Sequence, residues 1–191
     1  MDSELLAKCR AGDPQAIETL VNEYQGKVFR LCLSILDSQE DAQDAAQETF
    51  IAALKALQGY RGEAALQTWL FSIAINTCRG QLRQLKRKTR LQENLIDPAM
   101  TEDQSRQTPE RQVMEAQRTQ AIWRAISGLD EKHRLPIVLR YYHELSTQEI
   151  ADVLGLNIGT VHSRLSNART RLTGELKRAN IAPTGRVRDS Q

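Results

Sequence analysis

Apolar side chains recur at intervals of three and four residues along most of the chain, which is the spacing of one face of an α-helix. A first helix start is predicted at Asp13 and Pro14, because Asp caps a helix N-terminus well and Pro suits the first helical position. The apolar stripe that follows consists of Leu20, Val21, Tyr24, Val28, Leu31, Cys32 and Ile35. No run alternates apolar and polar residues as a half-buried strand would. The pattern predicts an all-α fold.

Two further helices are predicted before residue 91. Ser38 with Asp41 three residues later opens the first of them. Its apolar face consists of Ala46, Phe50, Ala53, Leu54 and Leu57. The second follows the loop GYRGEAALQ and turns one apolar side inward, made of Phe71, Ala74, Ile75, Cys78, Leu82 and Leu85. Its other side carries Trp69, Ser72, Asn76, Arg79, Gly80, Arg83 and Arg87. This helix is therefore amphipathic, with a basic stripe on its exposed side.

The segment 91–112 interrupts the helical pattern with two prolines, several acids and few large apolar residues, and we interpret it as a linker. Helical spacing resumes from Val113 and ends near Ala179. We therefore expect one domain over 1–90, a second over 113–179, and a disordered tail over 180–191.

The stretch 146–172 predicts a helix-turn-helix. Ser146 and Glu149 form a capping box for a short helix, Gly155 ends it, and Asn157 caps a second helix. The core side of the second helix consists of Val161, Leu165, Ala168 and Leu172. Its opposite side presents small or hydrogen-bonding residues, chiefly His162, Ser163, Arg164, Ser166 and Asn167, with Arg169 and Arg171 expected near phosphates. A helical hairpin with a solvated basic face is the alternative, and the coincidence of caps, turn and spacing favours DNA binding.

Charge is distributed unevenly along a chain that is almost neutral. The 191 residues contain 26 Lys and Arg against 24 Asp and Glu, a net charge of +2. Residues 37–63 carry six acids and two bases, whereas residues 79–90 carry six bases and no acid. The second predicted helix of the helix-turn-helix is also basic. Separate acidic and basic zones indicate several distinct partners.

The basic stripe has three possible uses. A helix on an anionic membrane surface is disfavoured, because the preceding helices can bury the apolar face. A stripe that only solvates the protein remains open. The neighbouring loop favours nucleic acid, since Tyr60, Arg61 and Trp69 offer flat side chains on which the bases of an opened strand can stack. The exposed acids Asp41, Asp44 and Glu48, beside Gln47, lie on a different helix and suit a basic protein partner.

Other classes of function find little support in the sequence. Cys9, Cys32 and Cys78 match no metal-ligand spacing and are expected to be buried reduced thiols, with a redox role as the alternative. We expect no cofactor and no catalytic centre, because neither basic zone contains the acids or histidines that metal-assisted phosphoryl chemistry needs. The N-terminus has no signal-peptide pattern and no apolar run is long enough to span a membrane, so we expect a cytoplasmic protein.

Three motifs occur in order: DAQDAAQETFIAALKAL, YRGEAALQTWLFSIAIN and LSTQEIADVLGLNIGTVHSRLSNAR. They resemble bacterial RNA polymerase sigma factors of the sigma-70 family, specifically the extracytoplasmic-function (ECF) group that keeps only regions 2 and 4. The resemblance runs from Leu5 to about Leu176. It implies a region 2 helical bundle and a region 4 helix-turn-helix on a flexible linker, and a transcription initiation factor rather than an enzyme. Its partners would be core polymerase, promoter DNA and an anti-sigma factor, which could hold the protein at the membrane.

The resemblance also implies roles for individual residues. The surface that binds core polymerase would comprise Asp41, Asp44, Gln47 and Glu48. The minus-10 element would be opened and read by Tyr60, Arg61, Trp69, Asn76, Arg79 and Arg83. The minus-35 element would be read by His162, Ser163, Arg164, Ser166 and Asn167.

Two positions depart from the pattern of the family. Sigma factors of this group usually have Arg or Lys at the position of His162, and often Arg at that of Asn167. We therefore expect a different minus-35 preference, or more reliance on the other basic residues of the same helix. A conventional helix-turn-helix repressor or activator is the alternative function, and it leaves the basic stripe without a use.

Overall fold

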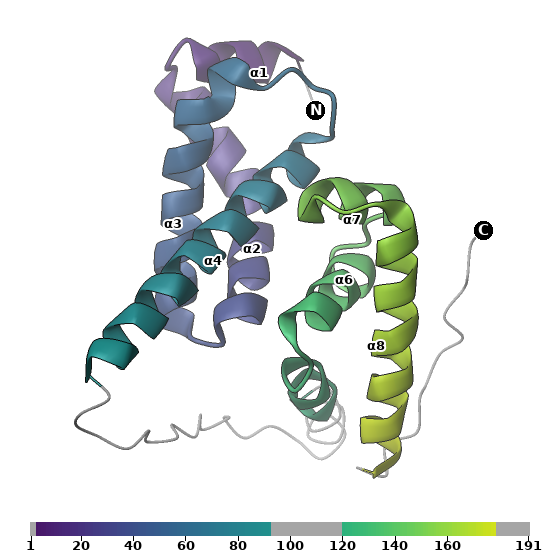
Figure 1. Ribbon diagram of the computed structural model, residues 1–191. Helices are drawn as coiled ribbons and strands as arrows, with labels where there is room; N and C mark the ends of the chain where they lie inside the picture. Colours follow the sequence, from purple (N-terminus) through teal and green to yellow (C-terminus); the bar gives the residue numbers. More distant parts are fainter. Residues whose placement is uncertain (1–2, 93–119, 179–191) are drawn as a thin grey trace, which may run out of the picture.

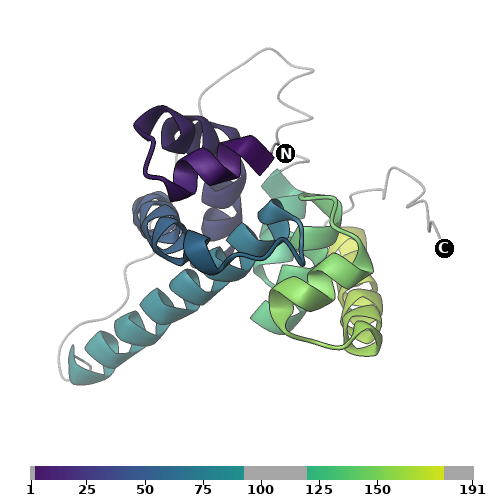
Figure 2. The same cartoon turned by 90° about the horizontal axis from the view of Figure 1, so that it is seen from above.

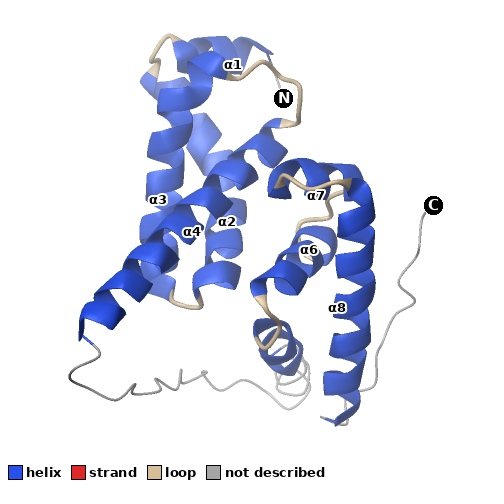
Figure 3. Ribbon diagram, viewed as in Figure 1, coloured by secondary structure: helices blue, strands red, loops and turns tan. Residues whose placement is uncertain are grey.

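The computed structural model describes residues 3–92 and 120–178, and every regular element in these ranges is helical (Figures 1 and 3). The N-terminal half contains α1 (Ser3–Arg10), α2 (Pro14–Leu36), α3 (Gln39–Ala56), the short 3-10 helix η1 (Leu57–Gly59) and α4 (Leu66–Gln92). The C-terminal half contains a helical stretch over 120–127, then α6 (Glu131–Tyr141), α7 (Thr147–Leu154) and α8 (Ile158–Arg178). The predicted all-α fold is confirmed. The predicted tail and most of the predicted linker lie outside the described residues.

Helices begin where the caps in the sequence predict. The Asp13 carboxylate accepts hydrogen bonds from the backbone N–H groups of Gln15 and Ala16, at 2.9 and 3.1 Å. The Ser38 hydroxyl accepts from the N–H of Asp41 at 3.3 Å. Between them, Asp37 adopts a left-handed conformation with φ of 55° and ends α2. These local bonds satisfy backbone groups that a helix end would otherwise leave unpaired.

The core of the N-terminal half lies where α2, α3 and α4 pack together (Figure 2). Val28, Leu31, Cys32, Phe71, Ala74 and Cys78 have no exposed surface there. Leu85 was predicted to join this core, and the prediction is wrong because its side chain is 42% exposed. The reason is visible in Figure 2, where the C-terminal end of α4 extends past the helices that cover its first turns. Helical spacing predicts which side is apolar but does not predict where the neighbouring helices end.

The C-terminal half is built around α6, α7 and α8. Ser146 and Glu149 form the predicted capping box at the start of α7, and Gly155 ends this helix with φ of 64°. Residues 155–157 then connect α7 to α8, so the predicted helix-turn-helix is present. Its core contains Leu139, Ile150, Val161 and Ala168, all fully buried.

The two halves are not separate in space. Helix α4 packs against α7, and α2 packs against α6 (Figures 1 and 2). The Phe71 ring from α4 meets the His143 ring edge-on, with centroids 4.7 Å apart. The Arg134 guanidinium of α6 donates a hydrogen bond to the carbonyl of Ile35 at 3.3 Å. The sequence predicts two helical units, but it does not predict this contact between them.

Candidate nucleic-acid interface

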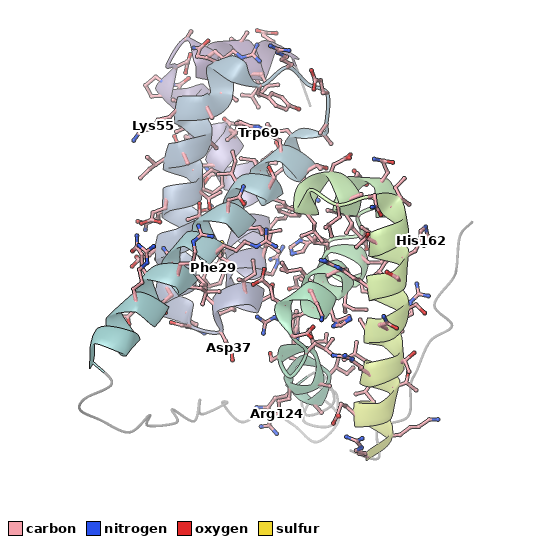
Figure 4. The ribbon with its side chains drawn as sticks, viewed as in Figure 1. Phe29, Asp37, Lys55, Trp69, Arg124 and His162 are labelled. Atoms are coloured by element: carbon pink, nitrogen blue, oxygen red, sulfur yellow. The ribbon has the colours of Figure 1, made fainter. Side chains whose placement is uncertain are left out.

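Helix α8 presents its predicted reading side to solvent. Asn157 sets the start of the helix, because its side-chain oxygen accepts hydrogen bonds from the backbone N–H and the hydroxyl of Thr160, at 2.8 and 2.7 Å. The exposed residues on this side are His162, Ser163, Ser166 and Asn167. Figure 4 shows His162 on the outer side of α8, pointing away from the rest of the chain. The first turns of α8 are therefore free to approach base edges in a major groove.

The three arginines predicted on α8 have different surroundings. Arg164 is half-buried. The Arg169 Nε donates to the Tyr141 hydroxyl at 2.7 Å, and its guanidinium lies 5.9 Å from the centre of that ring. Arg171 lies 3.5 Å from the carboxylate of Asp130. Contacts from residues around α6 thus orient the cations in the middle of α8, while Arg171 keeps about half of its side-chain surface for a phosphate.

The basic stripe on α4 is only partly open. Asn76 and Arg83 are exposed, as predicted. Arg79 instead pairs with Glu131 at the start of α6, with 2.8 Å between its Nε and the carboxylate, and about a third of each side chain is exposed. The structure therefore brings the centre of the stripe against the C-terminal half of the chain.

The loop before α4 is held in place by contacts of the buried Tyr60 side chain. Tyr60 is only 9% exposed, its hydroxyl donates to the Ala64 carbonyl at 2.6 Å, and its ring packs at 4.9 Å against Trp69. Burial raises the pKa of the Tyr60 phenol, so it remains a neutral donor. Trp69 is half-buried beside it (Figure 4), while Arg61 is exposed. Tyr60 thus lies under the loop, and Arg61 lies on its surface.

Arg10 is a positioning residue that sequence reasoning did not find. Its guanidinium donates to the carbonyl of Leu57 at 3.1 Å and also to the carbonyl of Tyr60. It therefore fixes the exit of α3 and the entry to the loop. No local pattern marks this role, because its partners lie 47 and 50 residues further along the chain.

The acidic surface lies on α3. Asp44, Gln47 and Glu48 are exposed and Asp41 is half-buried. Glu48 also accepts a hydrogen bond from the side chain of Gln81 on α4 at 3.2 Å, which orients it. One turn further on, Ile51 is 54% exposed. Sequence reasoning did not consider Ile51, which lies off the apolar face of α3.

Metal ligands and membrane spans were sought among the described residues. Residues 3–92 and 120–178 contain no group of three or more His, Cys, Asp or Glu side chains able to hold a metal ion. Within the same ranges, no helix combines the length and the apolar character that crossing a membrane requires. Cys9, Cys32 and Cys78 are buried free thiols. A hydrogen bond to Cys32, followed by burial, raises the pKa of Cys78, which therefore stays protonated.

The fold and these surfaces define a helical DNA-binding protein that carries both a helix-turn-helix and a separate basic helix. The sigma-70 region 2 family matches residues 20–88, and the sigma-70 region 4 family matches residues 119–172. The chain belongs to the sigma-70 family of bacterial RNA polymerase sigma factors, in the ECF group.

Relatives match the chain over nearly its whole length. The ECF RNA polymerase sigma-E factor of Haemophilus influenzae is 32% identical, over 92% of this chain and 95% of the relative. The RNA polymerase sigma-H factor of Pseudomonas aeruginosa is 33% identical, over 88% and 90%. The sigma-E factor of Escherichia coli K12 is 33% identical, over 92% and 94%. These similarities support the sigma-factor interpretation over a conventional repressor or activator.

Solved structures agree with this assignment. The structure of CnrH in complex with the cytosolic domain of CnrY matches with a TM-score of 0.66 and 25% identity, over 91% of this chain and 96% of that one. The sigma factor RpoE of Bartonella quintana, in complex with the anti-sigma factor NepR, matches with a TM-score of 0.69 and 22% identity, over 84% and 96%. The second match supports the fold alone.

Proposed function

We propose that this protein is a dissociable, non-enzymatic initiation factor that binds core RNA polymerase and directs it to specific promoters. The observation that carries the proposal is the exposed polar and basic side of α4, beside the Tyr60 to Trp69 loop. A repressor that only reads duplex DNA through α8 has no use for this second surface. A factor that must also hold an opened strand needs it, because unstacked bases require flat side chains and their phosphates require cations.

Three surfaces of the protein have separate binding roles in this proposal. The acidic surface of α3 (Asp41, Asp44, Gln47 and Glu48) binds core polymerase, with Ile51 adding an apolar contact. The minus-10 surface consists of Arg61, Trp69, Asn76, Arg79 and Arg83, with Tyr60 supporting the loop from below. The minus-35 surface consists of His162, Ser163, Arg164, Ser166 and Asn167, with Arg169 and Arg171 directed to phosphates.

The minus-10 step requires energy from the protein. Extruding one base from the stack costs a few kcal/mol, which contacts in the complex must offset. Because Tyr60 is already packed against Trp69 and bonded to Ala64, the loop is ordered before DNA arrives. Binding a base on this surface therefore costs little further loss of conformational freedom.

An anti-sigma factor is a further proposed partner. The structural relatives CnrH and RpoE are each in complex with another protein, which for RpoE is the anti-sigma factor NepR. A protein with the same two helical units and exposed surfaces on both offers a comparable target. Localisation in the cytoplasm, where core polymerase is found, is part of the same proposal.

The acidic surface provides the test of this function. We expect Asp44→Arg with Glu48→Arg to abolish co-elution with core polymerase in gel filtration, because reversing two exposed charges turns attraction to a basic partner into repulsion. Binding of the variant to minus-35 duplex DNA should persist, since α8 is untouched. Glu18→Arg, which reverses an exposed acid on α2, is the matched control and should co-elute normally.

Retained co-elution of the double variant would show that polymerase binds elsewhere. If the unmodified protein fails to co-elute at all, the repressor or activator interpretation replaces this one. Run-off transcription from a randomised promoter library, using the unmodified protein, would then identify the sequence preference of the two DNA surfaces.

A further inference from the structure

Helix α6 meets two arginines of α8, one at each of its ends. Tyr141 is the last residue of α6, and its hydroxyl accepts a hydrogen bond from the Arg169 Nε at 2.7 Å. Asp130 directly precedes α6, and its carboxylate lies 3.5 Å from a terminal nitrogen of Arg171. The 11 residues of α6 make this helix about 16 Å long, whereas Arg169 and Arg171 differ by only about 3 Å along the axis of α8. Helix α6 therefore crosses α8, and Figure 1 shows the two helices oblique to each other.

The two arginines lie on opposite edges of the surface that α8 presents to solvent. Arg169 and Arg171 are two residues apart, which is roughly 200° around a helix axis. One side between them is the core side, where Leu165 and Ala168 are buried and α8 packs on α6. The other side is exposed and has no Lys or Arg at its centre. This centre consists of His162, Ser163, Ser166 and Asn167. The two cations therefore flank the reading side of α8.

An α-helix in a major groove lies between two phosphate backbones. The groove is about 12 Å wide, which is close to the diameter of a helix with its side chains. Each edge of such a helix therefore faces a different strand. Cations on opposite edges can contact phosphates of opposite strands, and contacts of this kind set the register and orientation of the helix without reading bases.

We propose that α6 holds Arg169 and Arg171 so that each contacts a phosphate of a different strand of the minus-35 duplex, with Tyr141 as the positioning residue for Arg169. The proposal rests on the assignment of α8 to the minus-35 element made above. Tyr141 lies outside the helix-turn-helix, so a residue of α6 joins the surface that determines how α8 sits on DNA. The contact is pre-formed, which lowers the conformational entropy that Arg169 loses on binding.

The residues that orient the two arginines differ in charge, so the two phosphate contacts should differ in strength. Tyr141 orients Arg169 through its hydroxyl and through its ring, whose centre lies 5.9 Å from the guanidinium, and a phenol does not offset the positive charge. Asp130 is a carboxylate and offsets part of the charge of Arg171. It also lies 3.8 Å from Lys132, so its negative charge is shared between two cations. Arg169 should therefore make the stronger contact with a phosphate.

Neutralising single phosphates on each strand tests the proposal. The full-length protein in complex with core polymerase is bound to a promoter selected from the library, and one phosphate of the minus-35 element at a time is replaced by an uncharged methylphosphonate. With the unmodified protein, the complex should weaken about three- to tenfold at a position on each strand. Arg169→Ala should remove this sensitivity on one strand only, and Arg171→Ala should remove it on the other strand only.

Tyr141→Phe distinguishes positioning from a general effect on the fold. The variant keeps the ring and removes the hydroxyl, so the complex should weaken about two- to fivefold. The sensitivity assigned to Arg169 should shrink, while that assigned to Arg171 should stay at full size, whereas general damage would change both. Tyr142→Phe is the matched control, because it removes the hydroxyl of the next residue, whose ring packs on His143. It should leave the sensitivity of both strands unchanged.

The possible outcomes separate this proposal from the function on which it rests. Sensitivity that Arg169→Ala and Arg171→Ala remove on the same strand, or on neither, would overturn the two-strand arrangement. A full-size Arg169 effect in Tyr141→Phe would overturn the positioning role of Tyr141. Failure of the unmodified protein to form any complex with core polymerase would instead overturn the proposed function, and the assignment of α8 with it.

Discussion

His143 is a titratable side chain buried at the contact between the two halves. It is 9% exposed, its Nε2 has no hydrogen-bond partner among the described residues, and its ring lies between those of Phe71 and Tyr142. Burial, followed by the nearby charges of Arg30 and Lys27, lowers its pKa to about 4. His143 is therefore neutral in the folded protein at pH values where it begins to protonate in the unfolded chain.

This shift predicts a loss of stability in acid. The unfolded chain binds a proton to His143 as the pH falls through about 6.5, whereas the folded chain does so only near 4. The free energy of unfolding should fall over this window, by up to about 3 kcal/mol from this group. Urea unfolding at pH 7 and at pH 4.5 measures the loss.

His143→Phe should remove this part of the pH dependence, because the ring contacts remain and the titrating group does not. The matched control is His162→Gln, which changes an exposed histidine of α8 and should keep the dependence of the unmodified protein. Equal pH dependence in the His143 variant and the control would assign the effect to other groups.

At the scale of single helices, capping residues allowed the starts of helices to be predicted from the sequence. The starts of α2, α3 and α7 follow from Asp13, Ser38 and Ser146, because a cap and its helix are only a few residues apart. The turn at Gly155 is predictable for the same reason, because the glycine directly follows the helix that it ends. Features that depend on distant residues were not predictable: the Arg10 contacts with Leu57 and Tyr60 connect separate parts of the chain.

Glycines in α8 and before it provide a test of the turn. A Cβ added at Gly155 or at Gly174 would have nothing within 4 Å, so neither substitution by Ala causes a clash. Gly155→Ala should nevertheless lower the free energy of unfolding by about 1 kcal/mol, because Gly155 has φ of 64° and a side chain disfavours that conformation.

Gly174→Ala should have the opposite effect and raise stability by roughly 0.5 to 1 kcal/mol, since Ala is preferred over Gly inside a helix. The two urea midpoints, measured under the same conditions, should therefore move in opposite directions. A stable Gly155→Ala protein would mean that the connection between α7 and α8 relaxes to another conformation.

At the scale of the whole molecule, the sequence predicts the parts and misses their arrangement. Helical spacing predicts which side of α4 is apolar, and the motifs predict which residues face DNA. The position of Arg79 against Glu131 depends on how two units meet, and their surfaces carry no periodic signal of that contact. Tyr60, predicted as a stacking surface, lies mostly buried against Trp69, a contact within the N-terminal half that helical spacing also does not predict.

The salt dependence of promoter binding tests whether the basic stripe contacts phosphates in the promoter complex. For the polymerase complex on a promoter selected from the library, log K falls with log salt concentration in proportion to the phosphates neutralised. Arg79→Ala with Arg83→Ala should reduce the size of this slope by about 1 to 2. Lys55→Ala removes an exposed base from α3, away from the stripe, and should leave the slope unchanged. If the double variant also keeps the full slope, the stripe on α4 is a solvated surface and does not contact phosphates.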